Sequence, residues 1–345
     1  MRSLLCILTL CVPFWSQQAC SAEHNAFFNG VLRYESDSEH PTLNDRERLR
    51  YIASAGITSS WNHTWETHVR LRTGVKDRQN SAAHTVYRIT DQSLGQRDVF
   101  IDRAYMVGRF DNITLSAGKI PWLSEQITDI FWDRDLNPMG VAFDITLAPT
   151  HQLHLAYLKP LDGSSATVGH LSLAQWQARY QWRDVEFGLM PWYVNYSGDT
   201  ATYAVNDTHL DNQFIRLSSY VKWGQWRLGA DIGKSIKGQA HFPSNDFQDQ
   251  NASYAVELRH GQLKEPKAIL TQFRAFHVER YGVISEFAQD GTARFATSNL
   301  RGWEVRLRRQ MTENWWLGVR YTDATTIIGP QEAGKRLRLE AQFRF

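Results

Sequence analysis

The sequence predicts an all-β fold, a transmembrane antiparallel β-barrel of about 16 strands, within a range of about 14–18. Three observations support this prediction. Apolar and polar residues alternate in many separate runs, as they do in strands with two different faces. No apolar run reaches the roughly 20 residues that a spanning helix needs. Aromatic residues make up 12% of the chain although its mean hydropathy is −0.45, a combination typical of a barrel with a polar interior.

Residues 335–345 show the alternation most clearly. Leu337, Leu339, Ala341, Phe343 and Phe345 alternate with Arg336, Arg338, Glu340, Gln342 and Arg344. One face of such a strand is apolar, and the other carries mostly guanidinium groups. In a membrane barrel the apolar face meets lipid and the polar face meets a wet interior. This single strand would also suit a soluble two-layer protein, so the rest of the chain decides.

The N-terminus has the pattern of a secretory signal peptide. Arg2 supplies a positive charge, residues 4–15 form a short apolar run, and Cys20-Ser21-Ala22 provides small residues before a cleavage point. We therefore expect a signal peptide at residues 1–22 and an outer-membrane barrel at residues 23–345. All three cysteines lie in the signal peptide, which excludes disulfides, thiol catalysis and cysteine-ligated zinc from the barrel.

The alternating runs predict one strand each. We expect strands at about 26–34, 46–58, 63–73, 98–109, 112–119, 140–148, 151–159, 168–182, 185–195, 213–223, 225–235, 252–260, 267–279, 300–309, 315–324 and 335–345. Short turns then alternate with long connections, which fall at about 35–45, 74–97, 120–139, 160–167, 196–212, 236–251, 280–299 and 325–334. In outer-membrane barrels the short turns are periplasmic and the long loops are extracellular.

Two residue types refine the strand assignment. Trp182, Trp223, Trp226 and Trp315 flank short turns on the apolar face, where we expect an aromatic girdle at the membrane interface; ordinary packing is the alternative. Most prolines lie in predicted connections, as strands require. Pro191 does not, so its strand is expected to be bulged or misassigned.

The inward phase of the strands is rich in arginine. The arginines expected to line a channel are Arg50, Arg70, Arg72, Arg179, Arg216, Arg227, Arg259, Arg306, Arg308, Arg320 and Arg338. Fewer acids share this phase. An interior lined in this way is expected to have a positive potential and to favour anions. If each arginine instead paired with a neighbouring acid, the interior would be neutral.

The segment ITDIFWDRDLNPMGVAFDI, residues 127–145, permits three interpretations. Asp133, Asp135 and Asn137 place oxygen atoms at alternate positions, as a calcium loop does, but Pro138 replaces the turn glycine. A structural turn with Asp and Asn side chains that cap the backbone explains the same residues. Alternatively the segment folds into the barrel and forms a constriction loop with Asp133, Arg134 and Asp135. We predict no metal and no cofactor.

Several short motifs lie within this pattern: Arg33-Tyr34-Glu35, Arg46 to Arg50, Arg70 to Gly74, Asp102 to Tyr105, and Trp132 to Ala142. Together they resemble a family of bacterial outer-membrane "putative porins", although Met139 stands where the family motif is expected to have Glu. The resemblance implies a barrel of about 16 strands with a pore role. A last strand that ends in Phe345 also resembles the signal that such proteins present to the outer-membrane assembly machinery.

We therefore expect a porin in the bacterial outer membrane, through which small polar solutes, preferably anions, diffuse passively. Its partners would be outer-membrane lipid, the assembly machinery and these solutes, without nucleic acid, and a homotrimer is left open. The alternative is a substrate-specific channel or exporter for an acidic saccharide, because an arginine-lined channel suits uronate chains. We expect no catalytic residues. A hydrolase would need a nucleophile, a histidine and an acid that converge, and no G-x-S-x-G motif is present.

Overall fold

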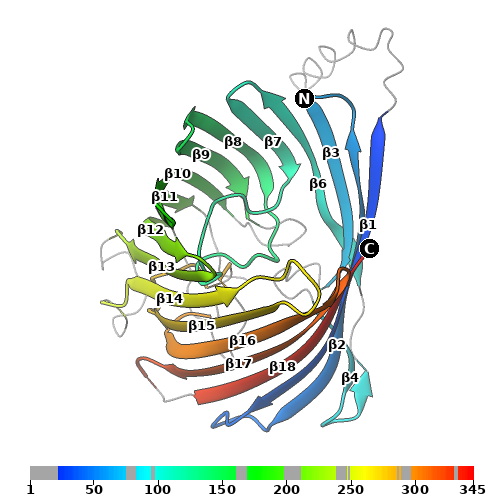
Figure 1. The fold of residues 1–345 in the computed structure, drawn as a ribbon. Helices are drawn as coiled ribbons and strands as arrows, with labels where there is room; N and C mark the ends of the chain where they lie inside the picture. Colours follow the sequence, from blue (N-terminus) through cyan, green and yellow to red (C-terminus); the bar gives the residue numbers. More distant parts are fainter. Residues whose placement is uncertain are drawn as a thin grey trace, which may run out of the picture.

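The computed structural model describes residues 22–74, 83–94, 98–160, 169–197, 211–237, 247, 249–285, 287–288, 297–329 and 333–345. These residues form one antiparallel sheet that closes on itself (Figure 1). Apart from its last residue, the predicted signal peptide lies outside the described residues. Among those residues, no helix is both long and apolar enough to cross a membrane.

Sixteen strands form the wall of the barrel. They are β1 (Glu23–Ser38), β2 (Arg46–Ser60), β3 (Trp65–Thr73), β6 (Val99–Phe110), β7 (Ile113–Lys119), β8 (Met139–Ala148), β9 (His151–Lys159), β10 (His170–Trp182), β11 (Val185–Ser197), β12 (Asn212–Trp223), β13 (Trp226–Ser235), β14 (Ala252–Gly261), β15 (Ile269–Val278), β16 (Leu300–Thr312), β17 (Trp315–Thr326) and β18 (Ala333–Arg344). Each predicted strand coincides with one of them, which confirms the fold class and the strand count.

The barrel closes through β1, which pairs with both β2 and β18. Arg33 of β1, for example, lies between Arg50 of β2 and Glu340 of β18. Closure leaves no strand of the described wall without neighbours on both sides, a condition that a membrane imposes because lipid cannot satisfy backbone hydrogen bonds. The backbone of Phe345 completes the seam: its N–H donates to Phe28 at 2.9 Å and its carbonyl accepts from Phe28 at 2.8 Å.

The connections alternate in position as predicted, with both chain ends on the side of the short turns. Glu23 pairs with Ser60, directly beside the β2–β3 turn. The lengths of the connections alternate less strictly than expected. The long-side connection at residues 39–45 is no longer than the short-side turn at residues 262–268.

Two strands lie outside the predicted set, within the β3–β6 connection. They are β4 (His84–Arg88) and β5 (Ser93–Leu94), and they form a hairpin. Because β3 is shorter than β2, the end of β2 lacks a partner in β3. β4 supplies it, with Arg48 opposite Arg88. The hairpin thus extends the wall on the side of the long loops.

Pro191 lies inside β11, and that strand is neither bulged nor misassigned, contrary to our expectation. The register with β10 is the same on both sides of the proline, from Gln175 opposite Trp192 to Ala178 opposite Leu189. Pro191 pairs with Leu217 of β12 on its other side. The strand therefore accommodates the missing N–H locally, without a shift of register.

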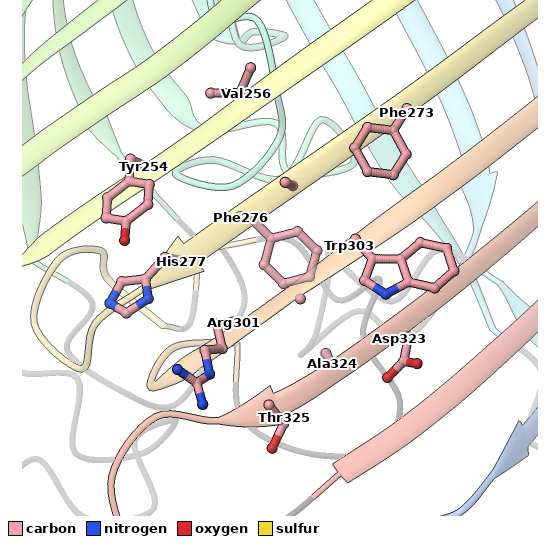
Figure 2. Close-up of a pocket in the computed structure, with 12 residues that line it drawn as sticks. Tyr254, Val256, Phe273, Phe276, His277, Arg301, Trp303, Asp323, Ala324 and Thr325 are labelled. Atoms are coloured by element: carbon pink, nitrogen blue, oxygen red, sulfur yellow. The ribbon is translucent and has the colours of Figure 1, made fainter.

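The outer face of the wall is apolar. Its exposed side chains include Leu32, Leu49, Val69, Ile101, Phe143, Ile215, Leu258 and Val319. Figure 2 shows part of this face across β14 to β17, where Tyr254, Phe273 and Trp303 stand around a shallow groove. Such a face suits lipid acyl chains.

The buried core lies inside the barrel rather than between two layers. Residues of the β7–β8 connection pack there against inward side chains of β8 to β15. Figure 1 shows this connection curling into the interior. It forms the centre of the candidate site.

Candidate functional site

The connection between β7 and β8, residues 120–138, is here named the inner loop. Most of its apolar side chains are buried, and Trp132 and Leu136 are 0% exposed. The rings of Trp122 and Trp132 stack at 4.2 Å, and Phe131 meets Trp192 and Phe214 edge-on. An exposed loop would not carry so many large apolar residues, and this density is a sequence signal of a folded-in loop that our prediction did not use.

One side of the inner loop is fixed to β13 and β15. Asp231 of β13 accepts hydrogen bonds from the N–H of Ile127 at 3.1 Å, and from the N–H and hydroxyl of Thr128 at 2.5 and 2.6 Å. Asp129 pairs with Arg274 of β15 at 2.5 Å. Asp231 and Arg274 are both buried. Buried charges are stable only when they are paired in this way.

The other side of the inner loop is fixed to β3 and β6. The Asn137 side chain accepts from Arg103 Nε and donates to Asp102 Oδ1, both at 2.8 Å. Arg72 donates to the Asp135 carboxylate at 3.0 Å. Asp102 and Arg103 are adjacent in sequence, yet both contact the inner loop. A register shift opposite Arg70 and Leu71 allows this.

These contacts bear on the calcium-loop and the structural-turn interpretations of Asp133, Asp135 and Asn137. Asp133 Oδ1 accepts the N–H of Asp135 at 2.8 Å, which is an Asx turn. The oxygens of Asp135 and Asn137 accept from arginines, so the polar side chains stabilise the turn and join it to the wall. Among the described residues, no group of three His, Asp or Glu side chains could hold a metal ion.

A second segment, residues 279–285 with 287–288, also folds inward after β15. Tyr281 and Phe287 are each 1% exposed. The Asp133 N–H donates to the Phe287 carbonyl at 2.7 Å, and the rings of Trp132 and Phe287 lie 5.3 Å apart. The inner loop and this segment thus support one another inside the barrel.

Arg216, which we expected to line a channel, is instead covered by these two segments. It is 2% exposed. Its guanidinium lies over the ring of Phe131 at 4.2 Å and donates to Ser253 Oγ at 3.0 Å and to the Gly282 carbonyl at 3.3 Å. Strand alternation places Arg216 correctly on the inner face, but it does not reveal the loop that covers it.

Many of the other predicted arginines are held in buried ion-pair clusters. Arg50 and Arg338 pair with Glu35 at 3.2 and 2.8 Å, and Arg48 also contacts it. Glu304 pairs with Arg320 at 2.5 Å and with Arg306. Arg70 and Arg72 share Asp102. The partial neutralisation that we considered is therefore present in the part of the wall from β16 to β3.

The remaining predicted arginines differ in their surroundings. Arg179 pairs with Glu125 of the inner loop, and Arg227 lies over the ring of Tyr220 at 4.4 Å. Arg308 lies over the ring of Trp316 at 5.0 Å. Among the described residues, neither Arg259 nor Arg308 has a carboxylate at ion-pair distance.

A cavity of about 930 Å³ lies in the half of the barrel near the short turns, between the inner loop and the wall. Its basic lining residues are Arg33, Arg70, Arg72, Arg103, Arg259, Lys264, Arg308 and Arg344, and its acidic ones are Asp135, Glu313 and Glu340. Basic groups thus outnumber acids by 8 to 3. Four of these, Arg33, Arg103, Lys264 and Arg344, were not among the channel-lining residues that we predicted.

The four predicted girdle tryptophans lie at the short-turn ends of their strands. Trp182, Trp223 and Trp226 are exposed, and Trp223 pairs with Trp226 across the β12–β13 turn. Trp315 stacks on Phe343 with ring centroids 5.9 Å apart. Arg134, which we placed near a possible constriction, is exposed and donates to the Ile127 carbonyl at 3.3 Å.

Comparison with known proteins agrees with the geometry. A family model described as "Putative porin" matches residues 16–161. No curated protein sequence is significantly similar to the chain. The high-pH structure of OprB from Pseudomonas putida is similar over 93% of this chain and 94% of that chain, with a TM-score of 0.64 and 9% identity.

Two further outer-membrane structures share the fold at a TM-score of 0.50. OccAB4 from Acinetobacter baumannii is 12% identical and matches over 94% of this chain and 98% of its own. OccK9 from Pseudomonas aeruginosa is 10% identical, with 94% and 99% covered. At such identities the likeness concerns the fold alone. The chain is thus similar to a family of bacterial porins over its N-terminal part, and it is a multi-pass barrel of the outer membrane.

Proposed function

We propose that this protein is an outer-membrane channel through which small polar solutes diffuse, with a preference for anions. The observation that carries the proposal is the cavity beneath the inner loop, where basic side chains outnumber acidic ones by 8 to 3. A low-dielectric wall focuses the potential of such groups into the interior. Selection by charge and width needs no catalytic group, so we propose a channel rather than an enzyme.

The inner loop would set the width of the path. It is joined to β13 and β15 on one side and to β3 and β6 on the other, so it crosses the interior. Its aromatic side chains fill the space against β8 to β15. Solutes would then pass between the loop and the arginine-bearing wall, with Asp135 and Arg72 at the narrowest part.

Within that wall, the arginines fall into two functional groups. Those paired with Glu35 or Glu304, such as Arg50, Arg338 and Arg320, are partly neutralised and are not among the residues that line the cavity. Arg259 and Arg308 keep their charge available to the cavity, and we propose that they contribute most to anion preference. The tryptophans at the short turns would hold the barrel at the membrane interface, as aromatic girdles do.

Reversal potential in a planar bilayer under a KCl gradient tests the proposal. Folded, heat-modifiable protein should conduct, and the sign of the potential should show chloride preference. A potential that shows potassium preference would overturn the anion selectivity but leave a channel. A complete lack of conductance from folded protein would overturn the channel itself.

A channel for an acidic saccharide is the second candidate. Three of the inward positions of β18 are arginines, Arg336, Arg338 and Arg344, and Arg320 of β17 and Arg306 and Arg308 of β16 lie on the next two strands. A row of this kind could hold a polyanion at several points. A soluble polyuronate that blocks chloride current saturably at low concentration would favour this candidate, whereas block no stronger than by a neutral glycan would exclude it.

A further inference from the structure

The outer face of the barrel contains an apolar groove of about 670 Å³ that the channel function does not use. It spans β16, β17, β18, β1 and β2, and Val86 of β4 contributes to it. Its outward side chains are aliphatic, apart from Tyr34 and Arg309: Leu32, Leu49, Leu307, Leu317, Val319, Leu339 and Ala341. Six of the leucine and valine side chains that line it are more than 40% exposed, so little protein covers them.

Ala341 explains why the wall is hollow at this point. It pairs with Leu317 on one side and with Leu32 on the other, and all three residues face outward. The small side chain stands between two long ones and leaves a gap between them. A flexible aliphatic chain can fill such a gap, whereas a rigid flat surface cannot.

Arg309 is the only outward charged side chain among those that line the groove. The other charged lining residues, Arg33, Arg50 and Glu340, lie on the inner phase and take part in ion pairs there. Arg309 is exposed, and among the described residues it has no carboxylate at ion-pair distance. Arg309 pairs with Leu317 of β17. Leu317 lies two residues after Trp315, the first residue after the short turn, so Arg309 is close to that turn.

We propose that this groove is a binding site for a phospholipid of the periplasmic leaflet, with an acyl chain over Ala341 and the lipid phosphate on Arg309. The short turns place Arg309 on the periplasmic side. A long arginine side chain near the interface can extend to the level of lipid phosphates, and guanidinium binds phosphate through paired hydrogen bonds. The aliphatic lining matches the hydrocarbon chain.

The aromatic groove in Figure 2 provides an internal comparison. It lies on the same face, over Ala275, and it is bordered by Arg301 of the same strand β16 at the long-loop end. That groove also contains Asp323, whose negative charge opposes phosphate binding. Arg301 is exposed like Arg309, which makes Arg301→Gln a matched control.

Native mass spectrometry of the purified barrel tests the site. The probes are dioleoylphosphatidylglycerol and dioleoylglycerol, which carry the same chains with and without phosphate. We expect the wild type to retain phosphatidylglycerol, Arg309→Gln to lower its occupancy about fivefold, and Arg301→Gln to leave it unchanged. Ala341→Leu should lower the occupancy of both lipids, because it fills the gap.

Two results would overturn the proposal. Equal occupancy in the wild type, Arg309→Gln and Ala341→Leu barrels would show that the groove does not bind lipid specifically. Loss of an oligomer in Ala341→Leu, without loss of bound lipid, would show that a second copy of the chain covers the groove. Heat modifiability of each variant establishes that it is folded, so a failure to fold is not mistaken for either result.

Discussion

Arg274 of β15 donates to Asp129 of the inner loop across the barrel interior, with 2.5 Å between Nη1 and Oδ1. Arg274 also pairs with Glu257 at 3.1 Å and lies 3.9 Å from Glu304. A single buried guanidinium thus joins the loop to three strands of the wall. We expect the position of the inner loop to depend on this pair.

The first prediction concerns Asp129→Asn. Removal of one charge from a buried pair destabilises a protein by about 3 kcal/mol, and here the loss falls on the contact between loop and wall. We expect a looser inner loop, a higher single-channel conductance and a lower midpoint in urea unfolding. Single-channel recording and urea titration of the detergent-refolded barrel measure the two effects.

Glu186→Gln is a matched control for that variant. Glu186 also forms an inward ion pair, with Lys222 at 3.3 Å, but the pair is half-exposed and lies at a short turn. Surface pairs contribute at most about 1 kcal/mol, so conductance should not change. A conductance increase in both variants would contradict a specific role of Asp129.

The second prediction concerns the pH dependence of the same pair. Burial opposes ionisation of Asp129, but the charges of Arg274, Arg306 and Arg320 outweigh it and hold the pKa of Asp129 well below its usual value. A carboxyl with a lowered pKa contributes stability above its unfolded pKa of about 3.9, and this is lost only as the pH falls through the lower folded value. The difference in urea midpoint between wild type and Asp129→Asn should therefore stay constant from pH 7 to about pH 4.5. A difference that disappears near pH 6 would show that Asp129 is not held in this way.

The third prediction concerns Asp231, which accepts hydrogen bonds from two backbone N–H groups and two hydroxyls. Asp231→Ala leaves these donors without partners, at a cost of about 1–3 kcal/mol for each group that stays buried. We expect an increase in conductance like that of Asp129→Asn. The double variant should increase it by less than the sum of the two, because both residues hold the same segment. Strict additivity would mean that they act on separate parts of the loop.

The fourth prediction concerns selectivity. Arg308→Gln and Arg259→Gln remove charges that face the cavity without a carboxylate partner, so each should shift the reversal potential toward zero. Arg338→Gln should shift it less, because Arg338 is buried beside Glu35 and does not line the cavity. Arg301→Gln, on the outer face of β16, should leave the potential unchanged. An equal shift in all four variants would indicate a general effect of surface charge and would contradict a specific role of Arg259 and Arg308 in the channel lining.

Alternation predicted the wall well because each strand has one face toward lipid and one toward the interior, and this contrast repeats along the whole chain. Residues 335–345 carry the pattern in full, and β18 occupies almost the same range. The β4–β5 hairpin was not predicted because its sequence lacks this contrast. It is short, and His84 to Arg88 show no clear contrast between two faces.

The interior could be predicted only in part, because strand phase gives the direction of a side chain and not what lies over it. Arg216 and Arg308 share the inward phase, yet the inner loop and the segment around Gly282 cover Arg216, while Arg308 faces the cavity. The fold of the inner loop depends on contacts between residues about 100 positions apart, such as Thr128 and Asp231. No local pattern encodes such pairs.

The fifth prediction concerns Phe345. Its backbone N–H and carbonyl pair with Phe28, and a substitution preserves both bonds. Its ring is 70% exposed and lies 6.5 Å from the Phe28 ring, so it contributes little to the folded barrel. If the terminal phenylalanine is the assembly signal, Phe345→Ala should reduce the amount of heat-modifiable barrel in the outer membrane. It should not impair refolding into detergent.

Phe343→Ala separates that signal from stability. Phe343 is also aromatic and faces outward on β18, but it stacks on Trp315, and such a contact is worth about 0.5–1.5 kcal/mol beyond the area that it buries. This variant should lower the urea midpoint of the refolded barrel and leave delivery to the membrane largely intact. The two variants should thus show opposite profiles in cells and in detergent. If Phe345→Ala impaired refolding as strongly as delivery, the ring would act in the folded barrel, and its role as an assembly signal would have to be abandoned.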